Sequence, residues 1–282
     1  MNFYWVYDLP NWLFAAITIF VYVLFGLAGL YATRKWVRRL HKIDHSHNDI
    51  VGYYLAAVTV FYGITLGLVA IGTWDTFSAT NSKVDGEAQV IASIYRDVAG
   101  YTEPYKSQMR QDLRGYVYNV IHVSWPLQRQ GIVPTGSGVY LDSLQTHLMS
   151  FQPKTMSEEI NQAEVFKQFN VLVEYRRARL NAVNTGLPTS LWALVVIGGL
   201  ICIVVTFFFD TKSFGMHFWM TSLFSGLLGL MVFLIGTMDN PFRGKLSVSA
   251  EPMELVYHHL MQKDIAKPVK TPLAATPQPA IH

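Results

Sequence analysis

Residues 51–74 read VGYYLAAVTVFYGITLGLVAIGTW, and none of these twenty-four residues carries a charged side chain. As an α-helix with a rise of about 1.5 Å per residue, the stretch is about 36 Å long, whereas the hydrocarbon core of a bilayer is roughly 30 Å thick. The stretch is therefore predicted to cross a membrane as a tilted helix.

Small residues recur along this stretch at intervals of three and four, so they share one face of the predicted helix. The face includes two glycines four residues apart, a pattern through which membrane helices approach one another closely. The pattern leaves open whether the face lines an ion pathway or packs against another helix. The face consists of Gly52, Ala56, Thr59, Gly63, Gly67 and Ala70.

The composition of the whole chain agrees with a membrane protein. Of the 282 residues, 51% are hydrophobic and only 15% are charged, and the mean hydropathy is +0.25. The formal net charge of +3 is too small and too dispersed to predict nucleic-acid binding. Cys202 is the only cysteine, so one chain can form neither a disulfide nor a thiolate metal site.

Three further apolar segments are long enough to span a bilayer, and the first of them lacks the basic start of a cleaved signal peptide. No predicted span contains Asp, Glu, Lys or Arg. Because ion-coupled transporters usually hold an ionisable group near the bilayer midplane, proton-coupled transport is not expected. The predicted spans are residues 12–33, 51–74, 191–209 and 216–238.

The polar region between the second and third spans has apolar residues at intervals of three and four, which is typical of amphipathic helices. Thr155 and Glu158 stand in the relation of a capping box, which predicts that a long helix begins there. The expected fold is all-α, with four transmembrane helices and a helical extramembrane domain between spans two and three. The expected divisions are a first transmembrane pair (1–75), the extramembrane domain (76–186), a second transmembrane pair (187–239), a turn and short helix (240–265) and a disordered tail (266–282).

Basic residues follow the first span in a short loop. Short loops rich in Lys and Arg remain on the cytoplasmic side of a membrane. We therefore expect residues 34–49 in the cytoplasm and the chain in a bacterial inner membrane as a multi-pass protein. The five cations of the loop are Arg34, Lys35, Arg38, Arg39 and Lys42.

Three arginines, Arg176, Arg177 and Arg179, stand on the predicted helix that leads into the third span. One interpretation is that they anchor the helix to anionic lipid headgroups. The other is that, repeated in each subunit of an oligomer, they form a ring of positive charge that concentrates inorganic anions. Both interpretations place them near the level of the headgroups. Phe61 and Leu66 of the second span are candidates for an apolar constriction in an ion pathway.

The loop before the second span contains histidines that could ligate zinc or nickel, His41, His45 and His47. The ordinary alternative is that they are solvated or meet lipid headgroups. We expect no metal site, and these three residues are the candidates if one exists.

Glu87 falls on the apolar stripe of its predicted helix beside Ala88, and we expect it at the solvated edge of a helical interface. Enzyme motifs such as G-x-S-x-G, a P-loop, G-x-G-x-x-G and H-E-x-x-H do not occur in the sequence. We therefore expect neither catalysis nor a cofactor.

Several short motifs, in their order and spacing, resemble the bacterial bestrophin-like domain family, which is named for a distant likeness to bestrophin anion channels. The resemblance covers about residues 45–260. No single motif is specific, but the series is. The motifs are His47 to Gly52, Glu87 with Ala88, Tyr116 to Pro126 with its Ser-Trp-Pro, Arg176 to Leu180, Leu187 with Pro188, Trp192, Pro241 with Phe242, and Gly244.

The resemblance implies a four-span subunit in a ring-shaped oligomer, with the second span lining an ion pathway that apolar side chains narrow. Bestrophins place an acidic calcium-binding cluster after an Asn-Pro-Phe-Gly turn. Here Asn240-Pro241-Phe242 is followed by Arg243-Gly244-Lys245-Leu246, so calcium gating through that site is not expected. Bestrophins also keep the large domain in the cytosol, whereas the basic loop at residues 34–49 predicts the opposite orientation.

Two functions from different classes follow. The first is an anion-permeable channel in a lipid bilayer, formed by a homo-oligomer such as a pentamer, with the second span lining the pathway. The second is a non-conducting structural or signalling membrane protein, in which the small-residue face packs against a helix and the extramembrane domain binds a partner.

Overall fold

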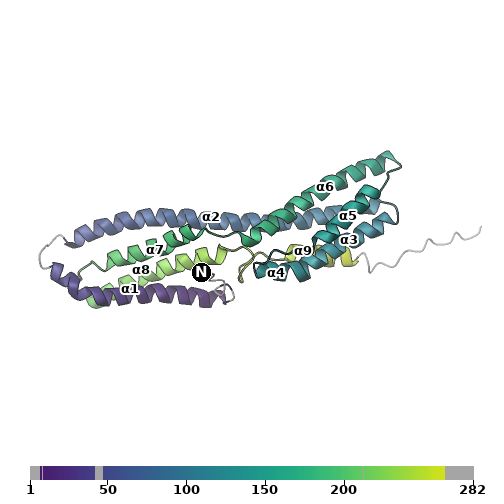
Figure 1. The fold of residues 1–282 in the computed structure, drawn as a ribbon. Helices are drawn as coiled ribbons and strands as arrows, with labels where there is room; N and C mark the ends of the chain where they lie inside the picture. Colours follow the sequence, from purple (N-terminus) through teal and green to yellow (C-terminus); the bar gives the residue numbers. More distant parts are fainter. Residues whose placement is uncertain (1–6, 8, 42–46, 212, 264–282) are drawn as a thin grey trace, which may run out of the picture.

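The computed structural model describes residues 7, 9–41, 47–211 and 213–263. Within these ranges the chain forms helices, turns and loops but no β-strand, as predicted. The molecule is elongated, with a bundle of apolar helices at one end and a polar helical domain at the other (Figure 1).

Four helices are long and apolar enough to cross a membrane, which confirms the prediction of a four-span, multi-pass membrane protein. Three of them contain a predicted apolar segment in full, whereas the helix of the third span ends at Thr206, three residues before the predicted end. None of these segments holds a charge that would have to be buried in hydrocarbon. The helices are α1 (Asn11–His41), α2 (His47–Asp97), α7 (Thr189–Thr206) and α8 (Phe214–Met238).

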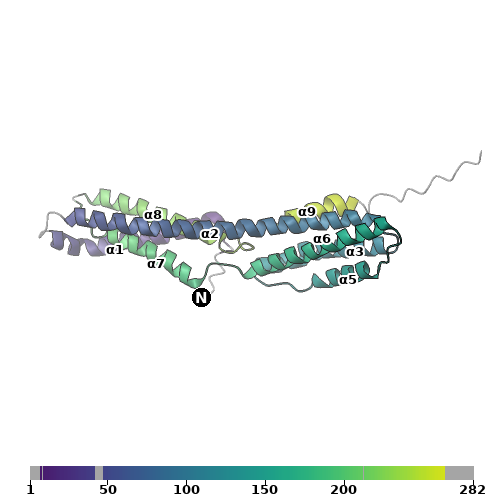
Figure 2. The same ribbon diagram turned by 90° about the horizontal axis from the view of Figure 1, so that it is seen from above.

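Helix α2 is continuous over 51 residues and belongs to both ends of the molecule (Figures 1 and 2). It does not end at Trp74, where the apolar stretch stops, because no proline interrupts the residues that follow. At about 1.5 Å per residue the helix is roughly 75 Å long. The second span and the first helix of the polar domain are therefore one rod.

The polar domain packs several shorter helices against the second half of α2. Thr155 caps the N-terminus of the longest of them, since its Oγ1 accepts a hydrogen bond from Glu158 N at 3.2 Å. The domain helices are α3 (Tyr105–Asn119), α4 (Trp125–Arg129), α5 (Gly138–Ser150), α6 (Met156–Asn181) and α9 (Glu251–Val256), with single 3₁₀ turns at Val98–Gly100 and Ala182–Asn184 and π turns at Val120–Ser124 and Tyr257–Met261.

Two apolar cores hold the molecule together, one in the membrane bundle and one in the polar domain. The membrane core takes side chains from all four spans, among them Leu30, Tyr62, Leu66, Val69, Val195, Ile203, Leu228 and Ile235. The domain core joins α2 to α3, α5, α6 and α9 through Val84, Ile91, Ile94, Met109, Leu113, Leu144, Leu172 and Met253.

Within the membrane bundle, α1 packs mainly against α8, whereas α2 packs against α7 and α8. The approach of α1 to α8 is the closest, because a Cβ added at Gly229 would lie 2.9 Å from the backbone of Ile19. Helices α7 and α8 lie between α1 and α2 in Figure 1. Helix α2 therefore forms one edge of the subunit.

Asp239 joins the ends of three segments where the bundle meets the domain. Its carboxylate accepts hydrogen bonds from Leu187 N at 2.5 Å, from Trp192 Nε1 at 3.0 Å and from Tyr7 OH at 3.2 Å. The start of α7, the end of α8 and Tyr7, four residues before α1, are thus fixed at one level along the molecule.

Candidate functional site

The face of α2 that points away from α7 and α8 is bare and strongly apolar. Phe61 and Leu68 are 75% and 67% exposed, and Ile64 and Ile71 are similarly uncovered. Their spacing of three and four residues places all four on one stripe of the helix. We call Phe61, Ile64, Leu68 and Ile71 the outer stripe.

The outer stripe continues beyond the apolar segment as polar and small residues. Asp75, Ala79 and Ser82 follow at helical spacing, and all three are exposed. The side of α2 that carries the outer stripe is therefore exposed both in the membrane bundle and in the polar domain.

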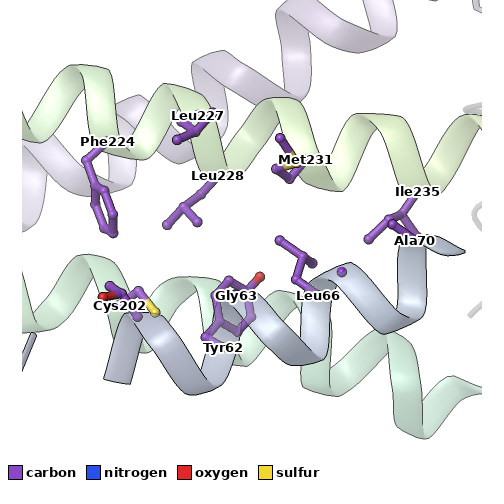
Figure 3. A pocket seen from close by; sticks show the side chains of 12 residues that line it. Tyr62, Gly63, Leu66, Ala70, Cys202, Phe224, Leu227, Leu228, Met231 and Ile235 are labelled. Carbon is purple, nitrogen blue, oxygen red and sulfur yellow. The ribbon is translucent and has the colours of Figure 1, made fainter. Parts of the chain in front are cut away.

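The small-residue face of α2 borders a groove between α2 and α8 (Figure 3). Thr59, Gly63, Gly67 and Ala70 line one side of it. Side chains of α8, including Phe224, Leu228, Met231 and Ile235, line the other side, and Cys202 of α7 also contributes. The groove has a volume of about 310 Å³, and a second hollow of about 260 Å³ extends it past Ala70 to Trp74 and Met238.

The glycines of α2 make no close contact within the subunit. A Cβ added at Gly52, Gly63 or Gly67 would meet no atom within 4 Å. By contrast, a Cβ at Gly198 of α7 would lie 2.6 Å from the ring of Tyr62. Close helix approach inside the subunit therefore depends on the glycines of α1, α7 and α8. The small-residue face of α2, which carries Gly52, Gly63 and Gly67 and is called the glycine face below, remains open.

The structure separates the two residues predicted as apolar constrictions. Leu66 is only 7% exposed and packs in the membrane core beside the groove, whereas Phe61 is on the bare outer stripe. Gly63 follows Phe61 by two residues and so lies about 200° further around the helix. Phe61 and the glycine face therefore point in nearly opposite directions.

A fully buried ion pair connects α2 to α6 inside the domain. Arg179 Nε lies 2.6 Å from Glu87 Oε2, and Arg179 Nη2 lies 3.1 Å from Glu87 Oε1. Tyr116 OH of α3 donates a hydrogen bond to Glu87 Oε1. The guanidinium carbon of Arg179 also lies 5.9 Å from the centre of the Trp125 ring. Three helices and the Ser-Trp-Pro segment thus meet at one buried charge pair.

Burial and the neighbouring charges shift the pKa values of Arg179 and Tyr116. Burial alone would lower the pKa of Arg179, but the neighbouring Glu87 carboxylate outweighs it and raises the pKa. Burial and the same carboxylate raise the pKa of Tyr116. Arg179 therefore remains a cation and Tyr116 a neutral donor over the whole physiological pH range.

Two predictions about these residues are wrong. Arg179 cannot attract anions or bind headgroups, because it is fully buried and paired. It lies beside Glu87, thirteen residues past Trp74 or about 20 Å along α2, and so is not at headgroup level. Glu87 is fully buried rather than at a solvated edge. Of the three arginines, Arg177 is exposed, and Arg176 is partly buried with its Nε 3.3 Å from Ser137 Oγ.

The sequence does contain a signal for this pair. Arg179 continues the apolar stripe that Phe169 and Leu172 form on α6, as Glu87 continues that of Val84 and Ile91 on α2. An acidic or basic side chain that is buried without a partner destabilises the fold. An acid on one apolar stripe and a base on another are therefore expected to pair when the two stripes pack together.

The loop proposed as a metal candidate is described only in part. His45 and the side chain of His41 lie outside the described residues. His47 Nε2 lies 2.8 Å from the carbonyl oxygen of Phe208, and Asn48 exchanges two hydrogen bonds with the backbone of Asp210. Among the described residues, no group of three or more His, Cys, Asp or Glu side chains could hold a metal ion. These contacts attach the start of α2 to the loop between α7 and α8.

The family model of the bestrophin-like domain matches residues 20–253, which is most of the chain. The chain belongs to the bestrophin-like domain family. The match begins within the first span and includes the other three spans and both charged partners of the buried pair, and it confirms the resemblance inferred from the sequence motifs.

Solved structures share the fold of this bestrophin-like chain at low sequence identity. A single-substitution variant of a bacterial bestrophin homologue from Klebsiella pneumoniae superposes with a TM-score of 0.68 at 11% identity, covering 90% of this chain and 99% of that one. A structure of such a homologue solved by Zn-SAD phasing gives a TM-score of 0.67 at 10% identity, covering 89% and 98%. No curated protein matches the sequence.

The turn after α8 differs from the calcium-binding turn of bestrophins. Residues 240–250 contain no Asp or Glu. Asp239, just before the turn, already accepts the three hydrogen bonds that join the span ends. Ca²⁺ takes oxygen ligands, among which carboxylates supply the charge, so the turn of this bestrophin-like chain lacks an acidic cluster of that kind.

Proposed function

We propose that this bestrophin-like chain forms a ring-shaped homo-oligomer that acts as an anion-permeable channel, with the outer stripe of α2 facing the central axis. The observation that supports this most is that α2 forms one edge of the subunit and keeps the same face bare in the membrane and in the domain. A helix arranged in this way can line one continuous path from the bilayer into the polar domain.

The outer stripe has the composition of a hydrophobic gate. Rings of Phe61, Ile64 and Leu68, one set from each subunit, would form an apolar constriction that conducts when it is wetted. Leu66 has no part in this constriction, because it packs inside the subunit. The proposed gate therefore keeps Phe61 from the original pair of candidates and adds the residues that share its stripe.

In this proposal the glycine face of α2 contacts the neighbouring subunit in the ring. Closed rings with more than two subunits need head-to-tail interfaces, in which one side of a subunit meets the opposite side of the next. The open glycines and the groove beside α8 lie on one side of α2 and can receive a neighbouring subunit closely. In this proposal Gly63 and Gly67 pack against protein rather than line the pore.

Two sets of charges act on ion selectivity in opposite directions. Asp75 stands on the continuation of the outer stripe, where a ring of carboxylates would attract cations. Arg176 and Arg177 of α6 add positive charge further into the domain. The family likeness to anion channels favours anions, so we propose that anions permeate and that Asp75 limits their rate.

Reconstitution in liposomes tests the proposal. The purified protein should release trapped chloride, and Phe61→Ala or Leu68→Ala should raise the flux by widening the apolar constriction. Leu223→Ala on α8 is the matched control, because Leu223 is 72% exposed but lies on another helix. If the assembled protein gives no flux of any ion in either direction, the non-conducting structural or signalling function replaces the channel. The proposed function requires no catalysis and no cofactor.

A further inference from the structure

Two loops that are distant in sequence are joined by two arginines. Arg243 Nη2 donates a hydrogen bond to the carbonyl oxygen of Gln130 at 2.8 Å. In return, Arg129 Nη2 donates one to the carbonyl oxygen of Gly244 at 3.4 Å. We call residues 129–133 and 243–246 the arginine-linked loops.

Each loop contains a glycine whose backbone conformation would be strained in any other residue. Gly131 has φ of +76° and Gly244 has φ of +84°, a backbone conformation that residues with a side chain rarely adopt. A Cβ at Gly131 would also collide with the guanidinium group of Arg243. The loops are therefore built to lie against each other.

The arginine-linked loops expose apolar side chains next to cations. Ile132 is 48% exposed and Leu246 is 49% exposed, and Val133 is exposed beside them. Arg129 and Lys245 are also exposed. Residues 129–137 and 240–250 contain no Asp or Glu, so the loops carry no acid of their own that would neutralise these cations.

The loops lie at the level where the apolar spans end and the domain begins. Arg243 is five residues past the end of α8, and its backbone N donates to Asn240 O at 3.0 Å. A Cβ at Gly244 would lie 3.7 Å from Tyr7 Cδ1. Tyr7 in turn binds Asp239, which fixes the start of α7 at the same level. Helix α4, which ends at Arg129, lies beside this junction in Figure 1.

Exposed apolar side chains mixed with cations at this level match the chemistry of an anionic bilayer surface. The cations attract lipid phosphates while the apolar side chains enter the region between headgroups and acyl chains. We propose that the arginine-linked loops bind the headgroups of anionic phospholipids in the leaflet from which the domain projects. This surface is separate from the outer stripe and the groove, and its test does not depend on ion conduction.

Lipid binding to the intact oligomer in detergent, followed by native mass spectrometry, tests the proposal. The probes are phosphatidylglycerol, which is anionic, and phosphatidylcholine, which is zwitterionic. Each cation near an anionic surface strengthens binding about fivefold, so Arg129→Gln with Lys245→Gln should weaken phosphatidylglycerol binding roughly 25-fold. Binding of phosphatidylcholine should change little.

The control removes the same charge from the end of the domain away from the spans. Lys154→Gln with Lys167→Gln, at exposed positions before and within the first half of α6, should leave the preference for phosphatidylglycerol unchanged. If Arg129→Gln disturbs folding, Lys245→Gln alone should still weaken phosphatidylglycerol binding about fivefold. Equal binding of both lipids by the wild type, or an equal loss in both double variants, overturns the proposal. A change in oligomer mass without any change in lipid preference also overturns it, because the loops would then be a contact between subunits.

Discussion

Arg179 of α6 and Glu87 of α2 are 92 residues apart in the chain, yet they form an ion pair from which solvent is fully excluded, with Nε and Oε2 2.6 Å apart. Helix α2 carries the outer stripe, and α6 leads into α7 through the 3₁₀ turn Ala182–Asn184 and a short loop. The pair thus fixes the extension of α2 against the segment that enters the third span.

Removal of one member of this pair should destabilise the domain strongly. Arg179→Met leaves the Glu87 carboxylate buried without its countercharge, which costs about 3–5 kcal/mol in such sites. Chemical denaturation in detergent, followed by circular dichroism, should show this loss in the free energy of unfolding. The exposed Arg177→Met is the matched control and should change stability by less than about 0.5 kcal/mol.

The double variant Glu87→Met with Arg179→Met separates pairing from packing. Because both charges are absent, it should be more stable than Arg179→Met alone. A single Arg179→Met variant as stable as the wild type would show that the pair is not buried in solution as the structure has it.

Glycines of α2 and α8 should respond in opposite ways to an added methyl group. Gly67→Ala should leave the subunit as stable as before or slightly more stable, because nothing lies within 4 Å of the new Cβ and alanine favours helix. Gly229→Ala should destabilise it, because the Cβ would lie 2.9 Å from the backbone of Ile19. Thermal unfolding in detergent measures both effects.

Larger side chains on the glycine face should affect assembly rather than folding. Gly63→Leu with Gly67→Leu should keep the helical content of the subunit but reduce the fraction of oligomer seen by light scattering in detergent. An oligomer fraction equal to that of the wild type would mean that neighbouring subunits do not pack on this face.

Neutralisation of Asp75 should change ion selectivity. If Asp75 lines the mouth of the pathway, Asp75→Asn removes a ring of negative charge and should raise chloride permeability relative to sodium several-fold. Reversal potentials in planar bilayers with a salt gradient report this ratio. Asp142→Asn is the control, since Asp142 is exposed but lies on α5, away from the outer stripe. An identical shift in both variants would argue against a specific place for Asp75 in the pathway.

The spans were predictable from sequence because an uncharged apolar run of sufficient length has few alternatives to a membrane helix. The small-residue face of α2 was also predictable, since helical spacing alone decides which residues share a face. Spacing does not show which face meets the other spans. For that reason Leu66, which is inside the subunit, was grouped with Phe61, which is outside it.

The buried ion pair was missed for a related reason. Three arginines close together suggest a surface cluster, and sequence proximity says nothing about a carboxylate 92 residues away. Helical geometry separates the cluster, because Arg177 and Arg179 point about 200° apart on α6. Only the packing of α6 against α2 brings Arg179 to Glu87 and leaves Arg177 in solvent.

The most direct test of the outer stripe as an ion pathway is block of flux by a charged thiol reagent at Leu68→Cys, in a background in which the buried Cys202 is replaced by alanine. Such a reagent reacts only where water reaches the thiol. The account predicts that modification of Leu68→Cys blocks chloride flux from liposomes, whereas modification of the control Leu223→Cys, at an exposed position on α8, does not. A conducting Leu68→Cys protein whose flux and thiol both remain unaffected by the reagent would contradict it.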